Sequence, residues 1–289
     1  MDVLLFGTAG TPLSSKGNDS ISGIRRVHEL GLGCMELEFV RGIKMGDRTA
    51  KLVGNVAREL GIMLSVHAPY YINLNAEGET LIKSRERILK SARLGYICGA
   101  KSVVIHAGFL QGSPRQAVYE RIKNQLIEIT EALKNEGVDI TLRIETMGRN
   151  SQFGNLEEVL DLTEINGILP CIDFSHLHAL TGKLNSREEF ACILECVENR
   201  LGREGLDSVH IHVSGIEYSD KGEKRHLVFA DSDFKYRELA QALCDFDVKG
   251  MVISESPDLE GDALTLKREY DLIHPSKNVL HDRNYGMIL

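Results

Sequence analysis

Residues 81–106 read LIKSRERILKSARLGYICGAKSVVIH, and this stretch shows the pattern that decides the fold. From Leu81 to Ile97, apolar residues recur at helical spacing, with lysine, arginine and glutamate on the other face. After Gly99 comes a short apolar run, Ser102 to Ile105, which has the length and composition of a buried strand. The stretch therefore predicts one helix followed by one strand, the repeating unit of an α/β protein.

The same alternation runs along the whole chain. The predicted strands are Val3 to Phe6, Cys34 to Phe39, Ile62 to Val66, Ser102 to Ile105, Ile140 to Ile144, Ile168 to Ile172, Val209 to Val213 and Met251 to Ser254. Eight such units in about 250 residues fit a (β/α)8 TIM barrel better than an open doubly wound sheet. We expect one barrel domain over residues 1–273 and a C-terminal tail over residues 274–289.

Composition narrows the class of protein. The chain has 289 residues, 43% of them hydrophobic, which excludes global disorder and allows a substantial core. We expect a cytoplasmic monomer without membrane contact, because no apolar run is long enough for a membrane span and the N-terminus lacks a signal-peptide pattern. The six cysteines form no CxxC pair and suggest no disulfide framework. The net charge of −8 argues against wholesale coating of nucleic acid but leaves room for a local basic patch.

Side chains that bind metals close six successive predicted strands. They are His67, His106, Glu145, Asp173, His212 and Glu255. The carboxyl ends of barrel strands share one face, so these side chains are expected to converge there. Ligation by imidazole and carboxylate suits zinc, manganese or iron, and the lack of thiolate argues against a structural zinc site.

Three further histidines, His176, His178 and His226, follow the sixth and seventh strands. One divalent ion needs about four ligands, so eight or nine candidates indicate two or three ions. Sites with several neighbouring ions are typical of phosphoryl chemistry, so the residues point to a metal-dependent hydrolase that cleaves phosphodiesters. We expect His210, two positions before the mouth residue of its strand, to support the site and not to bind metal.

Several segments together resemble one family. They are His67-Ala-Pro-Tyr70-Tyr-Ile-Asn-Leu74, Ile105-His106-Ala-Gly108, Glu145-Thr146, Ile172-Asp173-Phe-Ser-His176 and Glu255-Ser-Pro257. In this order and spacing, the chain from about residue 1 to 273 resembles the endonuclease IV family of apurinic/apyrimidinic endonucleases, within the xylose-isomerase-like TIM-barrel superfamily.

This resemblance implies three zinc ions and a DNA substrate. It assigns His67, His106 and Glu145 to the first ion, Glu145, Asp173, His212 and Glu255 to the second, and His176 and His226 to the third. Glu145 and Glu255 are the expected catalytic carboxylates. The implied reaction is hydrolysis of the phosphodiester 5′ to an abasic site in double-stranded DNA, leaving a 3′-hydroxyl. Tyr70 matches a residue that the family inserts at the lesion, and Lys224 and Arg225 would contact phosphate.

Two positions depart from the family pattern. The third zinc normally takes an aspartate two residues before the histidine, where this chain has Lys224, preceded by Glu223. Either a one-residue shift lets Glu223 substitute, or the third ion is weak or missing and Lys224 binds phosphate. In addition, His212-Val-Ser-Gly215 stands where the family has His-x-Asn-Asp.

Two other functions fit part of the pattern. A sugar isomerase or epimerase of the same superfamily would need one metal, which Glu145, Asp173, His212 and Glu255 satisfy. It would not need the remaining four histidines as ligands, so their presence favours the nuclease. A non-catalytic DNA- or metal-binding protein is the third alternative, which a ligand set without thiolates favours less.

Overall fold

The computed structural model describes residues 2–274 and shows a closed barrel of eight parallel strands. The barrel strands are β1 (Leu4–Ala9), β2 (Cys34–Glu38), β3 (Met63–His67), β4 (Ser102–Ile105), β5 (Thr141–Glu145), β6 (Ile168–Asp173), β7 (Val209–Val213) and β10 (Gly250–Ser254). The order around the barrel is β1-β10-β7-β6-β5-β4-β3-β2, so each strand pairs with its sequence neighbours in the barrel. The predicted TIM barrel and its eight strands are confirmed.

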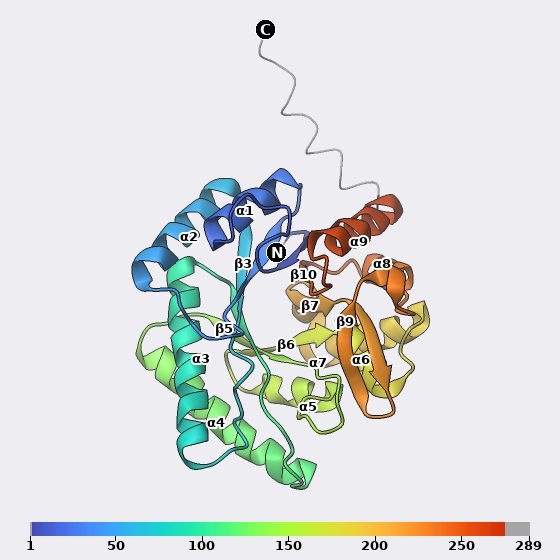
Figure 1. The fold of residues 1–289 in the computed structure, drawn as a ribbon. Helices are drawn as coiled ribbons and strands as arrows, with labels where there is room; N and C mark the ends of the chain where they lie inside the picture. The colour runs from blue at the N-terminus through green and yellow to red at the C-terminus, as the bar shows by residue number, and fades with distance from the viewer. Residues whose placement is uncertain (1, 275–289) are drawn as a thin grey trace.

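Helices follow each strand and form the outer layer (Figure 1). They are α1 (Ser20–Glu29), α2 (Asp47–Leu60), α3 (Gly78–Cys98), α4 (Arg115–Asn135), α5 (Leu156–Asp161), α6 (Phe174–Thr181), α7 (Arg187–Leu206), α8 (Tyr236–Asp245) and α9 (Glu260–Ile273), with short 3-10 helices at Leu162–Glu164 and Phe229–Asp231. None of the helices in the described range is long and apolar enough to cross a membrane. The expected tail, residues 274–289, lies outside the described residues except for His274.

Local sequence explains where several helices begin. Asp19 precedes α1 and accepts hydrogen bonds from the backbone of Ile21 and Ser22, as an N-cap does. Ser186 and Glu189 form a capping box at the start of α7, which satisfies two backbone donors at once.

Side chains at alternate positions of each barrel strand point to opposite faces, which separates core residues from site residues. On β5, Leu142 and Ile144 belong to the apolar layer between barrel and helices. Arg143 and Glu145 occupy the alternate positions and are buried polar residues. Because neighbouring strands are parallel, residues near their carboxyl ends lie side by side; Asp173, the last residue of β6, pairs with His212, the next-to-last residue of β7.

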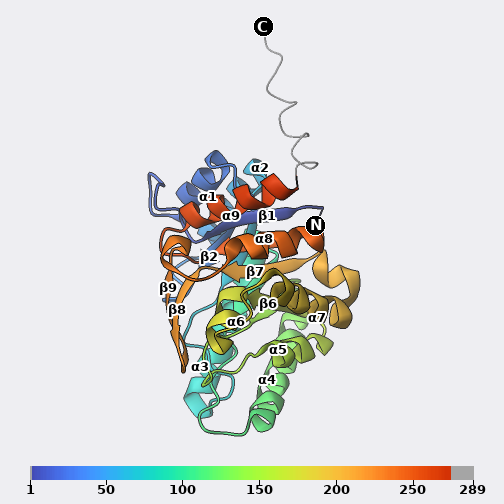
Figure 2. The ribbon, with the colours of Figure 1, turned by 90° about the vertical axis from the view of Figure 1, so that its right-hand side faces the viewer.

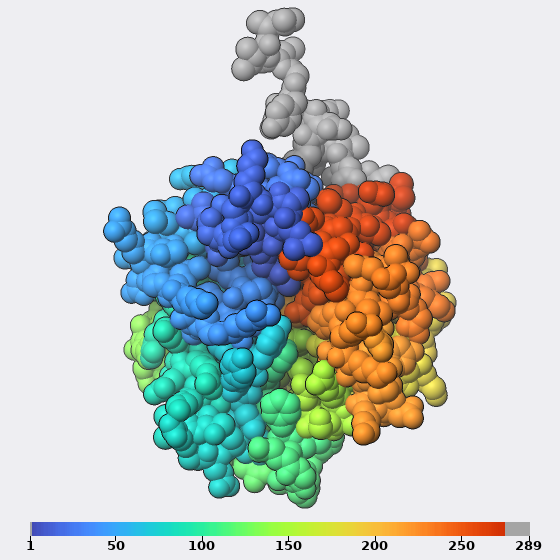
Figure 3. Space-filling model, viewed as in Figure 1, coloured from blue at the N-terminus to red at the C-terminus, as the bar shows by residue number. Residues whose placement is uncertain are grey.

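A β-hairpin of β8 (Gly215–Ser219) and β9 (Gly222–Leu227) interrupts the barrel pattern after β7. These two strands are not among the eight predicted from the sequence. Figure 2 shows the hairpin at the carboxyl ends of the strands, and in Figure 3 it forms part of the rim (orange) opposite the segments that follow β2 and β3 (blue and cyan).

Candidate metal centre

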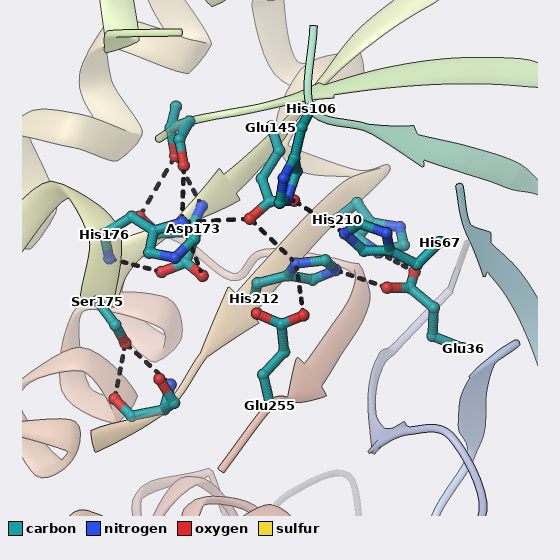
Figure 4. A network of polar contacts seen from close by, with 12 residues as sticks. Glu36, His67, His106, Glu145, Asp173, Ser175, His176, His210, His212 and Glu255 are labelled. Atoms are coloured by element: carbon teal, nitrogen blue, oxygen red, sulfur yellow. Dashed lines mark hydrogen bonds and ion pairs between the residues drawn. The ribbon is translucent and has the colours of Figure 1, made fainter. Parts of the chain in front are cut away.

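Glu145, the last residue of β5, lies at the centre of the converging side chains (Figure 4). Its Oε2 lies 2.9 Å from His106 Nε2 and 3.2 Å from His67 Nε2. Its Oε1 lies 3.2 Å from His176 Nδ1 and 3.7 Å from His212 Nδ1. Burial opposes its charge, but His106 and His212 outweigh this and lower the pKa of Glu145 well below its usual value. One fully buried carboxylate therefore contacts two histidines that lie on strands, His67 and His212, and two that follow strands, His106 and His176.

A second grouping surrounds the other oxygen of Glu145. One ligand atom each from Glu145, Asp173, His212 and Glu255 lies within 4.8 Å of the others. Asp173 is also the N-cap of α6, and its Oδ1 accepts a hydrogen bond from the backbone N–H of His176 at 2.7 Å. This cap fixes the carboxylate and the first turn of α6 together, so that Asp173 Oδ2 stays available for another partner.

Buried atoms without hydrogen-bond partners mark these two groupings. Glu145 Oε1, Asp173 Oδ2 and His212 Nδ1 are buried and make no hydrogen bond among the described residues. Buried polar atoms normally have partners, because an unsatisfied one costs about 1–3 kcal/mol. A divalent cation would satisfy all three, so the donor set fits a metal centre of imidazole and carboxylate ligands.

A third grouping contains Glu223 from the hairpin. His176, Glu223 and His226 each offer one ligand atom within 4.8 Å of the others. The Nε2 atoms of His176 and His226 are 3.4 Å apart, and Glu223 Oε2 lies 3.6 Å from His176 Nε2. Lys224 points elsewhere, since its exposed ammonium lies 3.3 Å from Glu217 Oε1, and Arg225 pairs with Glu217 at 2.7 Å.

A β-bulge explains why Glu223 and not Lys224 reaches the histidines. Opposite β8, Tyr218 pairs with Glu223 and Glu217 pairs with Arg225, so Lys224 is an extra residue without an opposite position on β8. A one-residue bulge reverses the alternation of side chains beyond it. Glu223 and His226 therefore share one face of β9, although they are three residues apart.

The hairpin tip is held against the loop that follows β5. Gly222 forms a bridge with Arg149, and the Glu223 backbone N–H donates to the Gly148 carbonyl at 2.8 Å. Arg149 Nε donates to the Glu223 carbonyl at 3.1 Å. These contacts fix the backbone that carries the Glu223 carboxylate.

Tyr70 lies at the rim of the centre. Its ring centroid is 5.3 Å from those of both His67 and His106, and it stacks on His106. Its side chain remains 46% exposed. An exposed aromatic ring thus stands directly beside the metal-ligand candidates.

The structure places the two remaining histidines named from the sequence, His178 and His210, in different surroundings. His178 lies away from the centre, where its ring contacts the Lys183 carbonyl at 2.7 Å and Asp233 at 3.1 Å. It therefore does not extend the cluster as expected. His210 lies inside the barrel beside Glu36, and together with Cys171 and His212 it forms a further set of ligand atoms within 4.8 Å of one another.

Sequence reasoning missed two acidic residues of β2. Glu36 is fully buried and contacts both His210 and His212. Glu38 pairs in register with His67, and burial raises the pKa of its carboxyl to about 8. The signal was present, because CMELE over residues 34–38 places acids at alternate positions of a predicted strand.

Comparison with known proteins places the fold in a family. The family model described as xylose isomerase-like TIM barrel matches residues 24–274. The chain belongs to this family. An uncharacterized protein of Methanocaldococcus jannaschii is 44% identical over 271 residues, which cover 93% of this chain and 97% of that protein.

More distant relatives carry functional names. Endonuclease 4 of Thermus thermophilus is 28% identical over 158 residues, about half of each chain (53% and 54%). The crystal structure of an endonuclease IV from Thermus thermophilus superposes with a TM-score of 0.71 at 20% identity, covering 93% of this chain and 99% of that one. A D-tagatose 3-epimerase-like protein gives 0.69 at 20% identity, covering 89% and 97%. These structures establish the shared fold, which hosts more than one chemistry.

Proposed function

We propose that this protein is a metal-dependent phosphodiesterase that hydrolyses DNA 5′ to abasic sites, an apurinic/apyrimidinic endonuclease of the endonuclease IV type. The observation that carries the proposal is the presence of three overlapping ligand groupings around Glu145 and His176. The partial matches to proteins named endonuclease 4 support it.

The candidate ligands would divide among three zinc ions. His67, His106 and Glu145 would hold the first, Glu145, Asp173, His212 and Glu255 the second, and His176, Glu223 and His226 the third. Mn²⁺ and Fe²⁺ suit the same ligand types. When bound at such a site, divalent ions make water a nucleophile near neutral pH and stabilise charge on the leaving oxygen.

The chain's own residues would orient the substrate and its metals. Glu145 would serve as a ligand of both the first and the second ion, and its burial would keep bulk water from competing for its oxygens. Tyr70, half-exposed beside His106, is placed to fill the gap left by a missing or displaced nucleotide. Lys224 and Arg225, exposed on the hairpin, would contact DNA phosphates, for which they would have to exchange part of their pairing with Glu217.

A sugar isomerase or epimerase is the second candidate. The grouping of Glu145, Asp173, His212 and Glu255 alone would hold the one metal that such an enzyme needs, and the fold is shared with an epimerase-like protein. That reaction gives no ligand role to His67, His106 or the third grouping. The additional ligands therefore favour phosphodiester hydrolysis.

A nicking assay tests the proposal. A labelled duplex with one abasic site is incubated with zinc-loaded protein, and cleavage 5′ to the lesion is expected. Glu145→Gln should reduce cleavage at least about 100-fold, because it removes a ligand, and even supporting residues of metal sites contribute about 10–100-fold. Glu164→Gln, an exposed glutamate paired with Lys123, is the matched control and should cleave normally. The absence of cleavage by metal-loaded protein that turns over a ketose or inositol would refute the proposal.

A further inference from the structure

Glu36 is a buried carboxylate in the interior of the barrel. Its side chain is 0% exposed, and it lies on the second strand, apart from the strand-end residues. Barrel interiors are usually filled by branched apolar side chains, and a buried charge is costly unless it has partners. Its presence therefore calls for a specific role.

Three side chains from two other strands surround the Glu36 carboxylate. Ser65 Oγ donates to Oε2 at 2.7 Å, and His210 Nε2 lies 3.1 Å from the same oxygen. His212 Nε2 lies 2.9 Å from Oε1. Only the Ser65 contact has the geometry of a hydrogen bond, and Glu36 Oε1, His210 Nε2 and His212 Nε2 make none among the described residues. The two imidazoles therefore meet the carboxylate as close ion-pair neighbours.

His212 lies between Glu36 and the metal centre (Figure 4). Its Nε2 faces Glu36, whereas its Nδ1 lies 3.6 Å from Glu255 Oε1 and 3.7 Å from Glu145 Oε1. A neutral imidazole has one N–H and one lone pair. If Nε2 carries the proton toward Glu36, Nδ1 presents its lone pair to the metal.

His210, from the same strand as His212, also contacts Glu36. Its Nδ1 lies 3.3 Å from Ser102 Oγ on β4, and its Nε2 faces Glu36. The ring is fully buried and spans the barrel interior between β4 and β2. Ser102, His210 and Ser65 therefore restrict the position of Glu36, and Glu36 in turn restricts the orientation of His212.

We infer that Glu36 is a positioning residue that fixes His212 with Nδ1 directed at the metal and increases the ligand strength of that nitrogen. This inference rests on the metal binding proposed above and does not depend on DNA as the substrate. Carboxylates behind ligating histidines typically contribute about 10–100-fold in metal affinity or activity.

Zinc affinity of variants tests the inference. Metal-free protein is titrated with zinc in competition with a chromophoric chelator. Glu36→Gln, which keeps the shape of the side chain but removes its charge, should weaken binding of one ion about 10–100-fold. Glu164→Gln makes the same change at an exposed glutamate paired with Lys123, and this matched control should bind zinc as tightly as wild type does. Unchanged zinc affinity in folded Glu36→Gln would overturn the inference.

The tautomer of His212 gives a second readout that needs no variant. In zinc-loaded wild-type protein labelled with ¹⁵N-histidine, His212 should show a protonated Nε2 and a metal-bound Nδ1. The opposite tautomer would overturn the inference even if Glu36→Gln did not fold. If wild-type protein fails to cleave abasic DNA while Glu36→Gln still loses zinc affinity, the proposed substrate is wrong and the role of Glu36 stands.

Discussion

Replacing Gly222 by alanine tests whether the hairpin tip positions Glu223. Gly222 has φ +93°, and a Cβ there would lie 2.1 Å from the Gly148 carbonyl oxygen. The left-handed backbone costs about 1–2 kcal/mol for an alanine, and overpacking costs about 1–3 kcal/mol more. Gly137→Ala is the matched control, because Gly137 has φ +70° and no atom within 4 Å of its Cβ position. Urea unfolding of metal-free protein should therefore show a loss of about 2–5 kcal/mol for Gly222→Ala and about 1–2 kcal/mol for the control.

Metal content separates positioning from general destabilisation. The Gly148 carbonyl that the new Cβ would meet also accepts the hydrogen bond from the Glu223 N–H. To relieve the overlap between the new Cβ and the Gly148 carbonyl, the hairpin tip must move away from the loop that follows β5. This movement increases the distance between the Glu223 carboxylate and His176. Elemental analysis should give about three zinc ions per chain for wild type and Gly137→Ala and about two for Gly222→Ala. Equal stability and equal zinc content in the two variants would refute the reasoning.

Two further predictions concern the rim and the acid–base behaviour of the centre. Tyr70→Ala should weaken binding to abasic duplex by about 1–3 kcal/mol, the contribution of an aromatic ring that stacks on a base, and should leave the zinc content unchanged. The control is Tyr96→Ala, which removes a similarly exposed ring on α3. A loss of zinc in Tyr70→Ala would mean that Tyr70 has a structural role. In metal-free protein, burial opposes the charge of His67, but Glu145 and Glu38 outweigh it and raise its pKa to about 10. Because the folded state holds this proton more tightly than the unfolded state, its stabilisation is complete below about pH 6.5 and is lost as the pH rises toward 10. Urea unfolding at pH 7, 8.5 and 10 should therefore show falling stability without metal and a weaker slope with zinc, and a flat profile without metal would contradict this assignment.

The barrel could be predicted because its signals are local. Each strand is a short apolar run bounded by polar residues or glycine, and helical periodicity fills the intervals, as in residues 81–106. The strand-end ligands could also be predicted, because parallel strands in a closed barrel bring their carboxyl ends together whatever their separation in sequence. His67 and His106 meet Glu145 for this reason.

The hairpin and the role of Glu36 could not be predicted, because both depend on contacts between residues far apart in the sequence. Residues 222–227 read GEKRHL, which is too polar to indicate a strand, and they form one because β8 and the 148–149 loop supply backbone partners. Glu36 lies within a strand and not at its end, so its importance appears only once His210 and His212 arrive from the far side of the barrel. The sequence alone could not decide whether Glu223 or Lys224 reaches the histidines, because the bulge in β9 determines which side chain faces them.

The bulge at Lys224 also affects how relatives of this protein should be recognised. A column-by-column alignment to an Asp-x-His pattern finds lysine where the acid belongs and would score the third grouping as lost. In space the acid is retained, because the extra residue and the displaced glutamate compensate for one another. Homologues that carry Glu-x-x-His at this hairpin should therefore be grouped with those that carry Asp-x-His. The criterion is that the acidic side chain faces the histidines, whatever its column in the sequence alignment.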